Sequence, residues 1–166
     1  LIPEYCEDAL KLTPGSGGIY MMAFGVFSLI GPVVGGKLVD KHGSKPVLLG
    51  GLLIAGLGYA FLSFVSSLQP GAIIIIVGLC IVGLGLGFAM GTPTNYMVLH
   101  NVDESSLTSG ISAITLSRQV GVSVAPAIYV SFIQTGYGAS GYIVMFAMVA
   151  ASCLFGLIAT LFYKGK

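Results

Sequence analysis

Few side chains in this sequence could take part in chemistry, because charged residues make up only 8% of it. Several of them gather in one short stretch, GPVVGGKLVDKHGSKP, at residues 31–46. A separate cation, Arg118, lies about 11 residues into an apolar segment that begins near Leu107, or ~16 Å along a helix. An ionisable group at such a depth is costly in a bilayer, which makes Arg118 a functional candidate.

Two interpretations of Arg118 stay open. The residue could face a transport pathway and pair with an anionic substrate or with an acid elsewhere in the protein. It could instead be structural, with a side chain that snorkels or pairs near the membrane surface. Weaker substrate or coupling candidates are Asn95, Thr92, Thr94 and Gln119, although a lone polar residue in a span more often forms a hydrogen bond between helices.

Other kinds of chemistry lack the residues that they need. No GxSxG, HExxH, phosphate-cradling loop or paired-carboxylate pattern occurs, so the sequence predicts no enzyme and no cofactor. Cys6, Cys80 and Cys153 have no ligand spacing, and we interpret His42 and His100 as interfacial residues, so no metal site is expected. No acid lies deep in an apolar segment, so if the protein is driven by protons, the carboxylate that titrates is expected outside this sequence.

The elements that must position these residues are membrane helices. The chain has 166 residues, of which 55% are hydrophobic and 25 are glycine, and its mean hydropathy is +0.98. A helix of about 20 residues crosses the hydrocarbon core. We therefore expect an all-α membrane protein in a single domain, 1–166, with about five transmembrane helices. The expected spans are about 18–39, 46–68, 71–98, 107–134 and 141–163.

Small residues recur every four positions in two of these spans. Gly83, Gly87 and Gly91 lie on one face of the third span. The fourth span carries a similar face, formed by Ala113, Ser117, Gly121 and Ala125. Such faces let helix backbones approach closely in lipid. They predict tight helix packing, and it stays open whether the faces also slide or rock during a conformational cycle.

The distribution of lysines predicts the orientation in the lipid bilayer. Lys41 and Lys45 follow the first span, and Lys164 and Lys166 follow the last, which puts both groups on one side of the membrane. By the positive-inside rule, loop 40–46 and the C-terminus are cytoplasmic and residues 1–14 are outside. A net charge of +1 gives no indication of a nucleic-acid partner.

The charged stretch also carries a spacing pattern, formed by Gly36, Asp40, Lys41, Gly43 and Lys45. It resembles the loop signature of the major facilitator superfamily, in which a glycine is followed by three residues, Asp, a basic residue, any residue, Gly, any residue and one or two basic residues. Pro46 departs from this signature and instead suits the first turn of a helix. The resemblance implies a conformational latch, in which Asp40 and Lys41 help to hold one cytoplasmic-side arrangement of two helical halves. A loop that only orients the chain is the alternative.

Two further segments, GLGLGFAMGTPTNYMVL and SGISAITLSRQVGVSVAPAIYVSFI, resemble late helices of the fourteen-helix drug:proton antiporter branch of that family. LIPEYCEDALKLTPGSGGIYMM resembles the extracellular end of one helix and the linker into the next. The resemblance implies a C-terminal portion of a helical half-bundle, whose missing partner is the N-terminal helical half of the same transporter. GPVVGG fits the core of the antiporter signature but stands in a different helix, so antiport is not inferred from it.

The resemblance therefore implies a secondary active transporter of the bacterial plasma membrane that works by alternating access. Its substrate would be a small organic molecule, and its activity would be proton-coupled efflux of drugs or toxic compounds. The alternative is a membrane module that does not transport, either a scaffold or a half-transporter subunit. These two possibilities differ in whether Arg118 is needed for activity.

Overall fold

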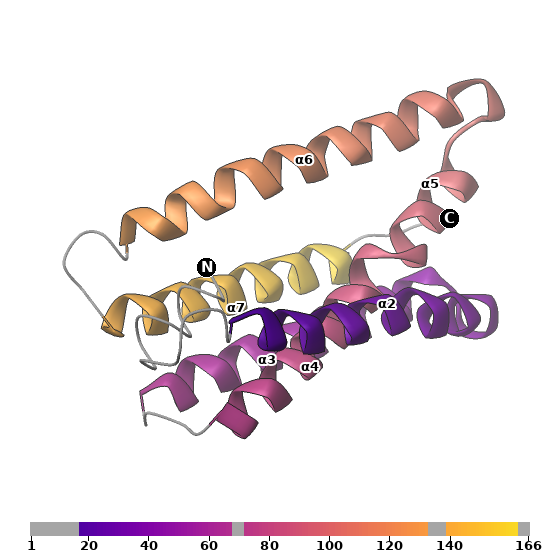
Figure 1. Ribbon diagram of the computed structural model, residues 1–166. Helices are drawn as coiled ribbons and strands as arrows, with labels where there is room; N and C mark the ends of the chain where they lie inside the picture. Colours follow the sequence, from indigo (N-terminus) through magenta and orange to yellow (C-terminus); the bar gives the residue numbers. More distant parts are fainter. Residues whose placement is uncertain (1–16, 68–71, 133–138, 163–166) are drawn as a thin grey trace.

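The computed structural model describes residues 17–67, 72–132 and 139–162 of the chain, and nearly all of them are helical. Five helical segments in these ranges have the length and hydropathy of membrane spans, as expected for an all-α membrane protein. The predictions for residues 1–14 and for Lys164 and Lys166 lie outside the described residues. Figure 1 shows the elements: α2 (Gly17–His42), α3 (Ser44–Ser66), α4 (Ala72–Met90), α5 (Thr92–Asn101), the short 3₁₀ helix η2 (Glu104–Ser106), α6 (Leu107–Phe132) and α7 (Ala139–Phe162).

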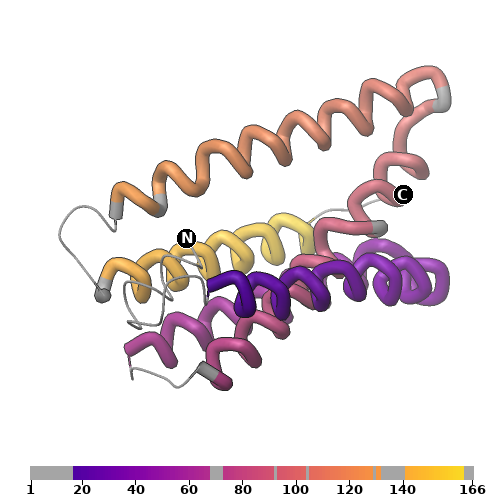
Figure 2. Tube along the Cα trace, viewed as in Figure 1, coloured from indigo at the N-terminus to yellow at the C-terminus, as the bar shows by residue number. Residues whose placement is uncertain are grey.

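Helices α2, α3, α4 and α7 form the packed body of the structure (Figures 1 and 2). Helix α4 packs against both α2 and α3, and α3 also packs against α7. A buried cluster joins all four helices near the N-terminal ends of α2, α4 and α7. Its members include Tyr20, Leu62, Leu79, Val82 and Phe146.

Glycines allow α4 to approach both of its neighbours at backbone distance. A Cβ atom added to Gly31 of α2 would lie 2.6 Å from Cα of Gly87, and one added to Gly87 would lie 2.8 Å from Cα of Gly31. On another face of α4, a Cβ atom at Gly85 would collide with the backbone of Ala55 in α3. Because lipid provides no hydrophobic drive between helices, such close van der Waals contact has to supply much of the attraction.

The third predicted span, 71–98, is not one helix, because the structure divides it into α4 and α5 at Gly91. Pro93 explains the division, since proline has no backbone N–H to donate to the carbonyl four residues earlier, at Ala89. The hydroxyl of Thr94 donates to that Ala89 carbonyl at 3.0 Å. The break therefore leaves no unpaired carbonyl at Ala89, which suits a site at membrane depth.

Helix α6 stands apart from the packed body along most of its length (Figure 1). Most of its described side chains are exposed, and it is the least apolar of the five segments. The hydroxyls of Ser112, Thr115 and Ser117 donate to carbonyls four residues earlier, at 2.7–2.9 Å. Helix α6 thus satisfies these hydroxyl donors internally, as a helix in an apolar environment must.

The two faces of small residues differ in their surroundings. Cβ atoms added to Gly83, Gly87 and Gly91 would all lie within 3.0 Å of atoms of α2. On α6, Ala113, Ser117 and Gly121 are exposed and Ala125 is half-buried. A Cβ atom added to Gly121 would meet nothing within 4 Å among the described residues. Close packing on the α6 face therefore stays a prediction.

Candidate functional site

A pocket of about 470 Å³ lies between α6 and the packed body. Helices α3, α4, α5, α6 and α7 all contribute to its wall. Most of the wall is apolar, and it includes Leu48, Leu52, Leu86, Met90, Ile114 and Val149. The polar side chains that line it are those of Arg118, Thr94, Tyr59 and Ser152. A mostly apolar cavity with a few polar groups is the usual form of a small-molecule site.

Arg118 supplies the charge of this pocket. Its side chain is half-buried, and among the described residues it is the one charged group in the lining. The hydroxyl of Thr94 donates to the Ala89 carbonyl, and that of Ser152 donates to the Met148 carbonyl at 2.9 Å. Both hydroxyl oxygens remain available as acceptors, whereas the guanidinium offers up to five N–H donors. The pocket therefore suits a ligand that carries acceptor groups or negative charge.

The structure brings together only some of the residues that the sequence singled out. Arg118 and Thr94 line the same pocket, although they belong to different helices. Asn95 and Gln119 are exposed and do not line it, and the side chain of Thr92 lies outside the described residues. Arg118 thus has a cavity beside it in this structure, and its role in transport or in stability stays a prediction.

Three lining residues were missed from the sequence: Tyr59 on α3, and Ser152 and Cys153 on α7. Each looks like an ordinary member of an apolar helix, and Cys153 is buried. The ring of Tyr59 stacks on that of Phe146 in α7, with centroids 6.4 Å apart. No sequence pattern could have found these residues, because they reach the pocket only through the packing of α3 against α7.

A tight turn at Gly43 joins α2 to α3 and contains the charged loop. Gly43 has φ 84°, a left-handed conformation that glycine adopts without steric cost. Its N–H donates to the Val39 carbonyl at 2.8 Å and so closes the end of α2. Asp40 and Lys41 are exposed, and neither has a hydrogen bond or ion pair within the described ranges. Gly36, one turn before Asp40, is half-buried.

The turn is also connected to the last helix. Nζ of Lys45 donates to the carbonyl oxygen of Leu161, near the C-terminal end of α7, at 3.2 Å. A lysine at this place satisfies a carbonyl that has no partner within its own helix and complements the negative end of the helix dipole. The contact holds the α2–α3 turn beside the end of α7.

The described part of the chain contains no group of three His, Cys, Asp or Glu side chains that could hold a metal ion. His100 lies near the end of α5, where Nδ1 is 3.0 Å from the Tyr96 carbonyl and its ring stacks on that of Tyr96 at 3.8 Å. The geometry of His100 is therefore accounted for by contacts within its own helix.

Comparison with known proteins gives a family match. A family model described as Major Facilitator Superfamily matches residues 1–166. An MFS-type transporter of Bacillus subtilis, YfiU, is 32% identical over 141 residues, covering 84% of this chain and 26% of that protein. The riboflavin transporter RibZ of Clostridioides difficile is 29% identical, with 100% of this chain and 39% of RibZ covered. A multidrug resistance protein B homolog of Mycobacterium tuberculosis is 24% identical over 77% of this chain and 24% of its own length.

The chain thus spans less than half of the length of these curated relatives. The family description and the names of YfiU and RibZ point to a transporter and not to an enzyme.

Proposed function

This chain belongs to the major facilitator superfamily, whose model matches all of its residues, and we propose that its protein is a secondary active transporter working by alternating access. It is an integral membrane protein, with five helical segments able to span a bilayer in the described part of the chain. In this proposal the remaining helices, including the N-terminal helical half, belong to polypeptide beyond this chain, which covers 26% of YfiU and 39% of RibZ.

The pocket beside Arg118 is the observation that carries the proposal. Transporter binding sites lie near the bilayer midplane between packed helices. Arg118 is the twelfth residue of α6, which has 26 residues, so it lies close to the middle of that helix. A charge at this depth is costly unless polar groups or water surround it, and the pocket places the hydroxyl-bearing side chains of Thr94, Tyr59 and Ser152 in the same wall as Arg118. We therefore assign Arg118 and Thr94 to the substrate path.

The substrate is a small organic molecule with an apolar body and acceptor groups. The apolar wall suits a drug-like or ring-containing compound, and the Arg118 guanidinium suits a carbonyl, carboxylate or phosphate group. The relatives named for riboflavin transport and multidrug resistance indicate the compounds to try first. Efflux coupled to protons is the expected mode, with the titrating carboxylate in the helices beyond this chain, because no acid lines the pocket among the described residues.

The turn at Gly43 acts as the conformational latch in this proposal. Asp40 and Lys41 are exposed near the end of α2, where they can pair with helices of the other half in one state and release them in the other. The rigid reversal at Gly43 and the contact of Lys45 with α7 keep the turn in place during that exchange. The loop lies on the cytoplasmic side of a bacterial plasma membrane.

The test of the substrate path is substitution of Arg118 in the full-length protein. Efflux of riboflavin, whose ring system carries carbonyl acceptors, from cells that lack their own exporters is measured with wild type, Arg118→Ala and Arg118→Lys. Loss of a hydrogen bond to a charged donor lowers affinity by about tenfold or more, so Arg118→Ala should transport poorly at low substrate concentration. Addition of a protonophore should stop efflux by the wild type.

Gln119→Ala is the matched control, because Gln119 is the next residue on α6 but does not line the pocket. It should transport as the wild type does at equal abundance in the membrane. If Arg118→Ala also transports normally at equal abundance, Arg118 is structural and the assignment of the pocket fails. Absence of any transport by the wild type, over a broad panel of compounds, would favour the scaffold alternative.

A further inference from the structure

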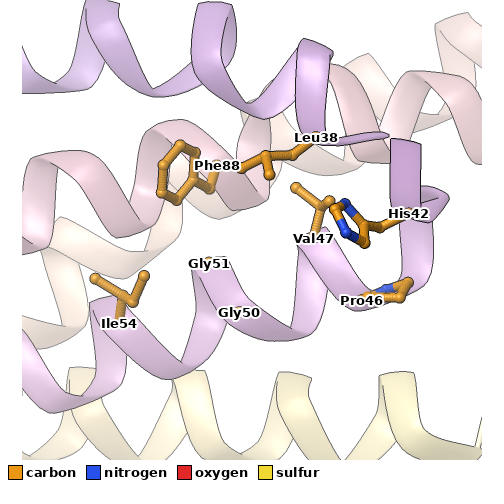
Figure 3. A pocket seen from close by; sticks show the side chains of 8 residues that line it. All are labelled: Leu38, His42, Pro46, Val47, Gly50, Gly51, Ile54 and Phe88. Atoms are coloured by element: carbon orange, nitrogen blue, oxygen red, sulfur yellow. The ribbon is translucent and has the colours of Figure 1, made fainter. Parts of the chain in front are cut away.

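A second, separate hollow lies between α2 and α3 at the end of the structure that carries the Gly43 turn. It is a groove of about 350 Å³, with Phe88 of α4 as its floor. Its sides include Leu38 and His42 from α2, and Val47, Gly50 and Ile54 from α3. Figure 3 shows Leu38, His42 and Val47 gathered toward the turn, with Phe88 and Ile54 farther along.

The dimensions of the groove match one leaflet of a bilayer. It runs along α3 from Pro46 to Ile54, eight residues or ~12 Å of helix. The hydrocarbon of one leaflet is about half of the 30 Å core, or ~15 Å. The groove therefore begins at the level of the headgroups and extends along most of one leaflet, as an acyl chain does.

One lysine, Lys41, supplies positive charge beside the mouth of the groove. His42 lines it, and Lys41 follows Leu38 by three residues, a spacing that puts two side chains on neighbouring parts of one helix face. Asp40 is two residues from both Leu38 and His42, so it lies on the opposite side of α2. The ammonium group of Lys45 is held at the Leu161 carbonyl, on the side of α3 that faces α7. His42 therefore offers a ring N–H at the mouth of the groove. Lys41 does not line the groove itself, but it places an exposed ammonium group beside the mouth, next in sequence to the exposed Asp40.

A glycine keeps the groove open. A Cβ atom added to Gly50 would meet nothing within 4 Å, whereas one added to the adjacent Gly51 would lie 2.6 Å from the backbone nitrogen of Ala89. Gly51 is thus required for the contact of α3 with α4. Gly50 is not required for the contact between α3 and α4. Its lack of a side chain leaves space in the groove beside Val47 and Ile54.

From these features we propose that the groove binds an anionic phospholipid. One acyl chain lies over Phe88 between α2 and α3, and the phosphate is held by Lys41 and His42. Charge complementarity selects the headgroup, because a basic side chain beside the membrane surface attracts anionic lipid. The proposal concerns a lipid site on the face of the α2–α3 pair that carries the groove, and it does not depend on what the protein transports.

Native mass spectrometry of the full-length protein in mild detergent tests this site. Wild type is mixed with phosphatidylglycerol or phosphatidylcholine of the same acyl composition, and the fraction that retains lipid is measured. Phosphatidylglycerol should be retained in preference, and Lys41→Gln should weaken its retention by about fivefold. Gly50→Leu, whose side chain fills the groove, should reduce retention of phosphatidylglycerol in the same assay.

A matched control separates this site from general effects. Gly25→Leu adds the same side chain to a glycine with no atom within 4 Å of its added Cβ. It should retain phosphatidylglycerol as the wild type does. Equal retention of the two lipids, or unchanged retention in both Lys41→Gln and Gly50→Leu, would overturn the proposal. Misfolding of Gly50→Leu alone would also overturn the proposal. It would mean that the new side chain collides with another helix of the full-length protein, and that this helix, not lipid, occupies the groove.

Discussion

Asp40 carries an exposed carboxylate for which the neighbouring helices of the described chain provide no hydrogen-bond donor or cation. Its carboxylate is exposed in the last turn of α2, and the described part of the chain offers it no hydrogen bond or ion pair. The sequence pattern could indicate its importance, because the spacing from Gly36 to Lys45 is distinctive. The pattern could not indicate the partner, because that group belongs to helices outside this chain in the proposed latch.

Replacing Asp40 by Asn in the full-length protein should reduce transport while leaving its abundance in the membrane unchanged. In the proposed latch the carboxylate interacts with a helix N-terminus or a cation in one state only, so its loss would shift the balance between states. A contribution of up to ~1 kcal/mol corresponds to a change in transport rate of about fivefold. Initial rates of efflux, normalised to the amount of protein in the membrane, measure the effect.

Asp103→Asn is the control for this change. Asp103 is also an exposed acid in a connection at the same end of the structure, between α5 and η2, but it lies outside the Gly36 to Lys45 pattern. It should transport normally. Equal rates for wild type and Asp40→Asn would remove the latch and leave loop 40–46 with a role in orientation alone.

At the scale of the elements, hydropathy predicts the helices well but not their contacts. The five expected spans correspond to helical segments. In a bilayer, a run of about 20 apolar residues must satisfy its backbone hydrogen bonds internally, and a helix does this within one segment. The spacing of Gly83, Gly87 and Gly91 indicates a face for close packing. The spacing does not identify GPVVGG of α2 as the segment that packs against this face. A repeat of small residues describes the surface of one helix and carries no information about which other helix lies against it.

The break between α4 and α5 has a similar explanation. Pro93 was visible in the sequence, yet the apolar run continues through it, and proline is tolerated in membrane helices when its neighbours satisfy the freed carbonyl. Here Thr94 satisfies that carbonyl from within its own chain. The break also sets the direction of α5, which brings Thr94 toward Arg118 in the pocket. A boundary that the hydropathy did not mark therefore helps to form the candidate site.

The contact between α2 and α4 should be sensitive to a single methyl group. In Gly87→Ala, the new Cβ would lie 2.8 Å from Cα of Gly31 and 3.0 Å from the Ser28 carbonyl, so the two helices must separate. Overpacking of this kind costs about 1–3 kcal/mol. The midpoint of thermal unfolding in detergent, measured on the full-length protein, should fall.

Gly25→Ala provides the comparison, because a Cβ atom at Gly25 on α2 would meet nothing within 4 Å. Its unfolding midpoint should match or slightly exceed that of the wild type. If Gly87→Ala is as stable as Gly25→Ala, the backbones of α2 and α4 are farther apart than the structure has them.

For the whole molecule, the two ends of the bundle have different characters. The buried aromatic and aliphatic cluster with Tyr20 and Phe146 lies at the end where α2 and α7 begin. The basic turn lies at the other end, where Lys45 contacts the last turns of α7. A lipid site beside Lys41, a latch at Asp40 and a positive-inside orientation all require this basic end to face the cytoplasm, where anionic lipid attracts it.

This orientation can be tested at the two ends of α3. Ser44→Cys and Ser67→Cys are made in a full-length protein that has no other cysteines, so that both changes have the same chemistry and leave every lysine in place. Helix α3 has 23 residues, ~34 Å, enough to separate the two sites by the thickness of the hydrocarbon core. A maleimide that cannot cross the membrane should label Ser67→Cys in intact cells, and Ser44→Cys only after the membrane is permeabilised. Labelling of Ser44→Cys but not Ser67→Cys in intact cells would invert the orientation, and with it the proposed cytoplasmic place of the latch and the lipid site.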